Sequence, residues 1–171
     1  ITLAYTLRLK QVPVVDVVTV AAGFVLRAAA GAVAVDVPMS RWFVLCITFG
    51  SLFIVVGKRY AELNEVGDAA GTRATLEVYS INYLRMILAV SLAGVLISYC
   101  AWALETSDVS TSSWPFYELS IVPMLMALMR YLLVLEEGGG SAPEEVFTSD
   151  RLLLFLGFCW LVVYGLAVYV S

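Results

Sequence analysis

Five long apolar segments dominate this sequence and limit the folds it can adopt. They cover residues 13–35, 38–57, 83–104, 115–135 and 152–170, and each is close to the ~20 residues that a helix needs to cross a hydrocarbon core of about 30 Å. Hydrophobic residues make up 61% of the chain and charged residues 14%, with a mean hydropathy of +0.92. A soluble domain of this size could not bury so much apolar surface, and the segments lack the alternation of outer-membrane strands. We therefore predict an all-α membrane protein with five transmembrane helices.

Positive charges gather on one side of this predicted bundle. With five spans, the segment before residue 13 and the loops 58–82 and 136–151 share that side, and they carry Arg8, Lys10, Lys58, Arg59, Arg73 and Arg151. The opposite side receives Arg41 alone. The positive-inside rule therefore places the cation-rich side in the cytoplasm and the C-terminus outside. We predict a multi-pass plasma-membrane protein, and we see no secretory signal pattern behind Ile1, which suggests part of a longer chain.

The residue inventory excludes some chemistry. The chain contains no histidine, and its three cysteines lie in separate apolar segments without CxxC spacing. We interpret Cys46, Cys100 and Cys159 as packing residues, so zinc sites and histidine-based catalysis have no material here. We expect no nucleic-acid partner and leave association into a homo-oligomer open.

Several ionisable residues are predicted to lie at one depth, near the cytoplasmic ends of the spans. They are Asp16, Lys58, Arg59, Glu62, Arg85 and Arg130. Arg27 is the exception, at roughly 20 Å from the cytoplasmic end of its helix, and it needs a partner, a cavity or the far interface. The arginines could be anchors at the lipid phosphates. Asp16 gains nothing from an anionic lipid surface, so we expect it to pair with a cation or bind a metal.

The string Gly57-Lys58-Arg59-Tyr60-Ala61-Glu62-Leu63 ends the second apolar segment. It is either a membrane anchor with an i, i+4 pair between Lys58 and Glu62, or a site that holds a polyanionic substrate. The loop that follows is long and polar, as expected of a binding segment or a surface helix. Further along, residues 138–141 read as a flexible linker, and Pro143-Glu144-Glu145 can open a short helix.

These residues resemble a known family. The strings Gly23-Phe24-Val25-Leu26-Arg27-Ala28, Phe49-Gly50-Ser51-Leu52-Phe53 and Gly57-Lys58-Arg59-Tyr60-Ala61-Glu62 resemble the decaprenyl-phosphate phosphoribosyltransferases, a branch of the UbiA superfamily of intramembrane prenyltransferases. The resemblance implies a nine-helix bundle of UbiA type, of which this chain has the C-terminal five helices. It places the Asp-rich NDxxDxxxD motif upstream of Ile1. The 171 residues alone are therefore expected to be inactive.

The resemblance also implies an activity. The family transfers 5-phosphoribosyl from phosphoribosyl pyrophosphate to a polyprenyl phosphate and releases pyrophosphate, with Mg²⁺, for the arabinan of the cell-wall arabinogalactan. We expect Lys58 and Arg59 to bind phosphate groups, and Glu62 to orient them or to contact ribose or metal. Asp16 would orient a cation or help to ligate Mg²⁺. Arg73 and Arg151 are candidates for the donor's 5-phosphate, and the remaining predicted substrate contacts are Lys10, Tyr60, Arg85 and Arg130.

Two other classes of function remain open at this point. A UbiA-type prenyltransferase acting on an aromatic or quinone precursor would share the bundle, but it needs a second Asp-rich motif. A transport or structural membrane module could also place charges at one depth. Such a module would normally line a path through the membrane with charge, and only Arg27 lies far from the cytoplasmic plane.

Overall fold

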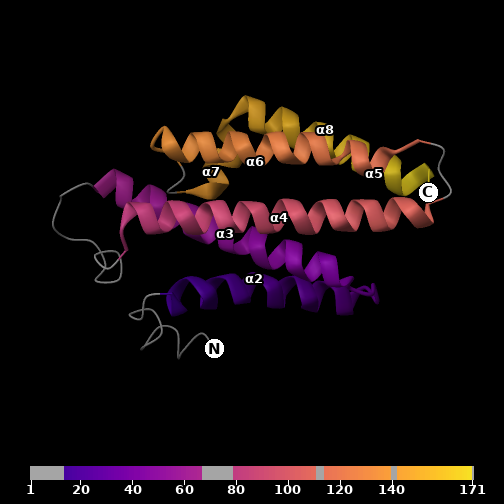
Figure 1. Ribbon diagram of the computed structural model, residues 1–171, viewed down its shortest axis with the longest axis horizontal. Helices are drawn as coiled ribbons and strands as arrows, with labels where there is room; N and C mark the ends of the chain where they lie inside the picture. Colours follow the sequence, from indigo (N-terminus) through magenta and orange to yellow (C-terminus); the bar gives the residue numbers. More distant parts are fainter. Residues whose placement is uncertain (1–13, 67–78, 111–113, 140–141, 171) are drawn as a thin grey trace.

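The computed structural model describes residues 14–66, 79–110, 114–139 and 142–170, and the regular structure in these ranges is helical (Figure 1). In chain order the helices are α2 (Val15–Ala34), α3 (Arg41–Val66), α4 (Ile81–Val109), α5 (Phe116–Leu119), α6 (Ile121–Glu136), α7 (Pro143–Ser149) and α8 (Arg151–Val170). Five segments are long and apolar enough to cross a membrane, namely Val15–Ala34, Arg41–Asn64, Ile81–Val109, Phe116–Glu136 and Arg151–Val170. The prediction of an all-α protein with five membrane-spanning helices is confirmed.

The bundle is built around the α3–α4 pair. Helix α2 packs against α3, while α6 packs mainly against α8 and also touches α3 and α4. Figure 1 shows α2 on one side of the α3–α4 pair and α6 with α8 on the other. A Cβ at Gly94 of α4 would collide with the ring of Phe49 on α3, which is why these two helices can approach closely. The core where the helices meet includes Phe53, Tyr60, Leu84, Tyr131 and Leu135, all of them fully buried.

Helix α3 is longer than the sequence suggested. We expected a loop to begin at residue 58, but the helix continues through Lys58 and Glu62 to Val66. Gly57 does not end the helix, because it serves a contact with α6: a Cβ at this position would lie 3.0 Å from Leu135 Cδ1 and 3.5 Å from Tyr131 Cε1. The residues after Gly57 include good helix formers. The charged string therefore lies on the last turns of a rigid helix.

The fourth span is broken near its start. Helix α5 is a single turn, and Ser120 separates it from α6. Pro123 lacks the N–H that would otherwise continue the hydrogen-bond ladder back to Leu119. The Ser120 hydroxyl instead donates to the Tyr117 carbonyl at 2.5 Å and is 2.7 Å from the Tyr99 hydroxyl. These bonds satisfy the polar groups that the break exposes.

Helix α7 lies between α6 and α8 in the chain. It begins at Pro143 and carries Glu144 and Glu145 in its first turn, as expected of a helix start. The predicted short helix after the glycine-rich stretch is therefore present. Its Phe147 ring stacks on Tyr131 of α6 with the ring centroids 5.4 Å apart.

Arg27 has found an aromatic neighbour. Its guanidinium carbon lies 5.5 Å from the centroid of the Phe24 ring, one helical turn earlier on α2. A cation over an aromatic face at this distance is favourable by about 0.5–1 kcal/mol at an exposed site.

Candidate functional site

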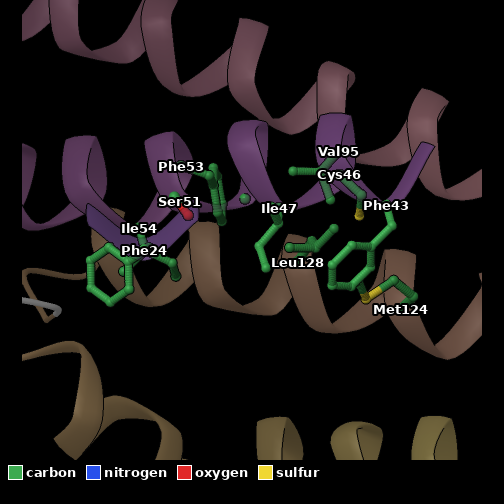
Figure 2. Close-up of a pocket in the computed structure, with 11 residues that line it drawn as sticks. Phe24, Phe43, Cys46, Ile47, Ser51, Phe53, Ile54, Val95, Met124 and Leu128 are labelled. Carbon is green, nitrogen blue, oxygen red and sulfur yellow. The ribbon is translucent and has the colours of Figure 1, made fainter. Parts of the chain in front are cut away.

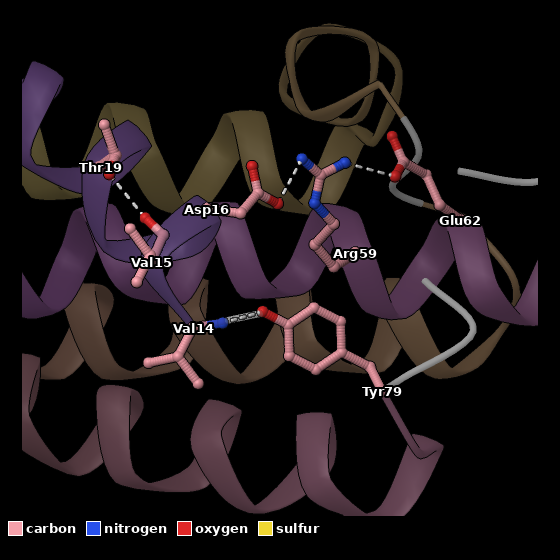
Figure 3. Close-up of polar contacts among 7 residues, drawn as sticks. All are labelled: Val14, Val15, Asp16, Thr19, Arg59, Glu62 and Tyr79. Carbon is pink, nitrogen blue, oxygen red and sulfur yellow. Dashed lines mark hydrogen bonds and ion pairs between the residues drawn. The ribbon is translucent and has the colours of Figure 1, made fainter. Parts of the chain in front are cut away.

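The centre of the candidate site is a buried arginine held by two carboxylates. Arg59 Nη2 of α3 donates to Asp16 Oδ2 of α2 at 3.0 Å, and Arg59 Nη1 donates to Glu62 Oε2 at 2.8 Å (Figure 3). Asp16 is 1% exposed and Arg59 is 7% exposed. Asp16 stands in the first turn of α2, where the helix dipole favours a negative charge. The expected pairing of Asp16 with a cation is what the structure shows.

The start of α2 is fixed by a further contact. The Tyr79 hydroxyl, just before α4, accepts a hydrogen bond from the Val14 backbone N–H (Figure 3). Within α2, the Thr19 hydroxyl donates to the Val15 carbonyl at 2.6 Å. Residues far apart in the sequence therefore hold Asp16 against Arg59.

The alternative pair between Lys58 and Glu62 is not the one that forms. Glu62 pairs with Arg59 in an i, i+3 arrangement, and within the described residues Lys58 forms no ion pair. Lys58 is half-buried and lies in the wall of a pocket. Its ammonium group is therefore the cation of the string that is not committed to a carboxylate in the described part of the chain.

That pocket is small and polar on one side. It has a volume of about 270 Å³, and Lys58, Arg59 and Glu62 supply its charged side. The remaining wall is formed by Val20, Phe24, Ile54, Val55 and Pro143. Pro143 comes from α7, so the pocket lies between α2, α3 and the start of α7. A phosphate group can enter a space of this size and meet both a cation and hydrogen-bond donors.

A larger apolar pocket continues from it. This pocket has a volume of about 380 Å³ and lies between α2, α3, α4 and α6 (Figure 2). Phe24 and Ile54 line both pockets, and Met124 and Leu128 of α6 form part of the far wall. The charged pocket thus opens along α3 into a space that suits a hydrocarbon chain.

A second polar cluster involves Tyr60, Arg85 and Glu136. The Tyr60 hydroxyl donates to Glu136 Oε1 at 2.9 Å and accepts from Arg85 Nη2 at 3.2 Å. Arg85 Nε is 3.4 Å from Glu136 Oε1, and its guanidinium carbon lies 5.9 Å from the Tyr60 ring centroid. The cluster ties the end of α3 to the start of α4 and the end of α6. None of its members lines the charged pocket.

Arg130 also has a local carboxylate. Its Nη2 and Nε atoms donate to Asp150 Oδ2 at 2.7 and 3.1 Å. Asp150 Oδ1 accepts from the Leu153 backbone N–H at 2.7 Å, which caps the start of α8. These hydrogen bonds hold the pKa of Asp150 below its usual value, with the Arg130 contact as the main cause. Arg130 therefore links α6 to α8 and lies outside the pocket.

The structure thus divides the predicted site residues. It brings Lys58, Arg59 and Glu62 to one pocket, with Asp16 behind Arg59. It places Tyr60 and Arg85 in a separate cluster and Arg130 on Asp150. Arg151 is exposed at the first position of α8 and does not line the pocket. Lys10 and Arg73 lie outside the described residues. The sequence analysis missed Glu136, Asp150 and Pro143, which carry no motif and acquire their roles only through helix packing.

The fit of Mg²⁺ to these residues can be tested on the carboxylates considered for it. Asp16 and Glu62 both contact the Arg59 guanidinium, so an organic cation already occupies the place between them. Within residues 14–66, 79–110, 114–139 and 142–170, no group of three or more acidic, cysteine or histidine side chains is arranged to hold a metal ion. The described residues therefore do not form a magnesium site of their own.

Comparison with known proteins agrees with this geometry. No family model matches the chain. The chain is 41% identical to the decaprenyl-phosphate phosphoribosyltransferase of Corynebacterium glutamicum, over 98% of its own length and 51% of the relative's. Proteins of the same name from Mycolicibacterium smegmatis and Mycobacterium tuberculosis are 38% and 39% identical, over 99% and 97% of this chain and 55% and 54% of theirs.

The chain spans about half the length of these curated relatives. Its similarity to them extends across all five spans, including the α3 string that carries Lys58, Arg59 and Glu62. The chain is therefore a homologue of the decaprenyl-phosphate phosphoribosyltransferases, matching about half of each.

Proposed function

We propose that the protein containing this chain transfers 5-phosphoribosyl from phosphoribosyl pyrophosphate to a long polyprenyl phosphate, with release of pyrophosphate. The observation that carries the proposal is the continuity of the two pockets. Lys58, Arg59 and Glu62 supply charge at one end, and Phe24 and Ile54 lead from there into the apolar pocket. A phosphate attached to an isoprenoid chain has this combination of groups. The printed names of the relatives supply the reaction class.

Lys58 is the proposed phosphate ligand. Its ammonium group lines the charged pocket without a carboxylate partner among the described residues, so it can neutralise an incoming phosphate without first breaking an ion pair. A charge-assisted hydrogen bond of this kind is roughly twice as strong as a neutral one. The attached chain would then run past Phe24 and Ile54.

Arg59 takes a different role from the one that we expected from the sequence. Its two terminal nitrogens contact Asp16 and Glu62, so we assign it as a positioning residue that holds Glu62 at the pocket wall. The proposed task of Glu62 is to accept hydrogen bonds from the hydroxyl groups of the donor ribose. Asp16 contributes by fixing Arg59.

In the proposed reaction, an oxygen of the polyprenyl phosphate forms a bond to ribose C1. The bond from C1 to pyrophosphate breaks, and its electron pair leaves with pyrophosphate. Positive charge develops at C1 in the transition state, and fixed negative groups near the ribose stabilise such charge. Arg73, Lys10 and Arg151 stay as proposed contacts of the donor's phosphates. The Mg²⁺ implied by the resemblance enters none of these steps, because the described residues do not fit it.

The proposal includes a location and a pathway. The cation-rich helix ends would face the cytoplasm, following the distribution of Lys and Arg along the chain. The lipid product would serve as a precursor for cell-wall arabinan.

The test uses the protein as its gene encodes it, in membranes, with labelled phosphoribosyl pyrophosphate and decaprenyl phosphate. Lys58→Ala should raise KM for the lipid phosphate on the order of tenfold or more, since about 1.4 kcal/mol of binding corresponds to a factor of ten. Lys58→Arg should retain most of the affinity. Arg41→Ala, at the opposite end of α3, is the control. The assignment of Lys58 fails if Lys58→Ala leaves KM and kcat unchanged.

A parallel assay separates this function from its rival. The same membranes are given a labelled prenyl diphosphate with an aromatic acceptor. Product from this pair, and none from phosphoribosyl pyrophosphate, would replace the proposed reaction with aromatic prenylation.

A further inference from the structure

A third pocket extends the path along α3. It has a volume of about 260 Å³ and is lined by Trp42, Phe43, Cys46, Tyr99, Trp102, Met124, Trp160 and Tyr164. We call it the aromatic chamber. Phe43, Cys46 and Met124 line both this chamber and the apolar pocket, and Figure 2 shows these three side chains together at one end of the apolar pocket. The charged pocket, the apolar pocket and the aromatic chamber therefore form one series.

The polar atoms of the chamber wall already have partners. Trp160 Nε1 donates to the Tyr99 hydroxyl at 2.7 Å, and that hydroxyl is also 2.7 Å from Ser120 Oγ. The Trp160 and Tyr164 rings stack with centroids 5.2 Å apart, and Trp102 meets Tyr164 at 5.9 Å. A polar ligand would lose its own hydration here without gaining a free hydrogen-bond partner. An uncharged, unsaturated hydrocarbon meets mainly aromatic faces and loses nothing.

The series has a length that can be compared with a substrate. Lys58 and Cys46 are both on α3, so the 1.5 Å rise per residue places them about 18 Å apart along the helix axis. The corresponding separation between Lys58 and Trp42 is about 24 Å. A lipid held by its phosphate at Lys58 reaches the chamber only when its chain extends beyond the shared wall at Cys46.

We infer that the aromatic chamber is the subsite for the distal part of the polyprenyl chain. Phe43, Cys46 and Met124 form the passage through which the chain enters it. The chamber makes the enzyme selective for long-chain polyprenyl phosphates, because a short chain ends in the apolar pocket. This inference rests on the proposed function, since Lys58 fixes the phosphate end of the chain.

The first test narrows the passage and compares two substrates of different length. Cys46→Phe fills the passage, and Cys46→Ala leaves it open as the matched control. The substrates are decaprenyl phosphate and geranyl phosphate, whose extended chain is shorter than the ~18 Å to Cys46. In the protein as its gene encodes it, Cys46→Phe should lower kcat/KM for decaprenyl phosphate on the order of tenfold or more, with geranyl phosphate unaffected. Equal losses with both substrates, or no loss with either, would overturn the inference.

A second measurement does not depend on catalysis. In a variant with Cys100→Ala and Cys159→Ala, Cys46 is labelled in nanodiscs with a membrane-permeable maleimide. Decaprenyl phosphate should slow the labelling several-fold, whereas geranyl phosphate should not. Equal protection by a phosphatidic acid would mean that the chamber holds any lipid chain, and absence of protection would mean that the polyprenyl chain does not pass Cys46. Protection without transfer activity would retain the chamber and reject the proposed reaction.

Discussion

Arg59 Nη2 and Asp16 Oδ2 lie 3.0 Å apart, joining two residues that are 43 positions apart in the chain. Both side chains are buried, so each depends on the other for neutralisation. Removing one partner of a buried ion pair costs several kcal/mol, because the remaining charge loses both its partner and its water.

Asp16→Asn should therefore lower the free energy of unfolding by about 3 kcal/mol. Glu62 still pairs with Arg59 in this variant, so we expect the loss at the lower end of the range for buried pairs. The measurement is denaturation of the purified protein in mixed micelles with increasing SDS. Asp36→Asn is the control, since Asp36 is exposed after the end of α2. Equal stability of the two variants would contradict a structural role for the pair.

The close approach of α3 and α4 gives a second prediction. Gly94→Ala should destabilise the protein by about 1–3 kcal/mol, because the added methyl group overlaps the Phe49 ring. Gly31→Ala on α2 is the matched control, since a Cβ there meets nothing within 4 Å. It should be neutral or stabilise by up to about 1 kcal/mol, through lower chain entropy in the unfolded state. A Gly94→Ala protein as stable as Gly31→Ala would show that Phe49 moves without cost.

The Asp150 cap predicts a dependence of stability on pH. Its pKa is lowered in the folded protein, mainly by Arg130, so the ionised form stabilises the fold. That contribution is fully present above the unfolded pKa, about 3.9, and is lost as the pH falls through the lower folded value. Unfolding measured between pH 6 and pH 3 should show this loss, and Asp150→Asn should flatten it. An unchanged slope in Asp150→Asn would mean that other groups cause the dependence.

The Tyr60 hydroxyl offers a fourth test. Tyr60→Phe removes the bridge between Arg85 and Glu136 without changing the ring that packs in the core. We expect a loss of about 1 kcal/mol in the free energy of unfolding. In a double-mutant cycle with Glu136→Gln, the two changes should be coupled, because both act on one hydrogen bond. Strict additivity would mean that this bond contributes nothing to stability.

The helices themselves could be predicted from sequence because hydrophobic length alone identifies a membrane span. The end of α3 could not. Gly57 resembles a helix terminator when only its neighbours in the chain are considered, and its contact with Leu135 of α6 becomes visible only when the helices pack. The break before α6 was also hidden, although Pro123 provides its cause.

The candidate site was predictable in part. The depth of Asp16, Lys58, Arg59 and Glu62 follows from counting residues along apolar segments, and three of them line one pocket. Their pairing could not be derived in this way, because counting does not say how two helices are rotated toward each other. Glu136 was missed for the same reason, since its partner Tyr60 is 76 positions away.

The arrangement of Lys58, Arg59, Asp16 and Glu62 has a consequence for how an anionic substrate approaches. These four side chains carry two positive and two negative formal charges, so their fields largely cancel beyond the pocket. Long-range steering by a cationic patch would make association strongly sensitive to salt. A balanced group of this kind recognises phosphate at contact distance, and capture from the membrane plane would then depend little on ionic strength.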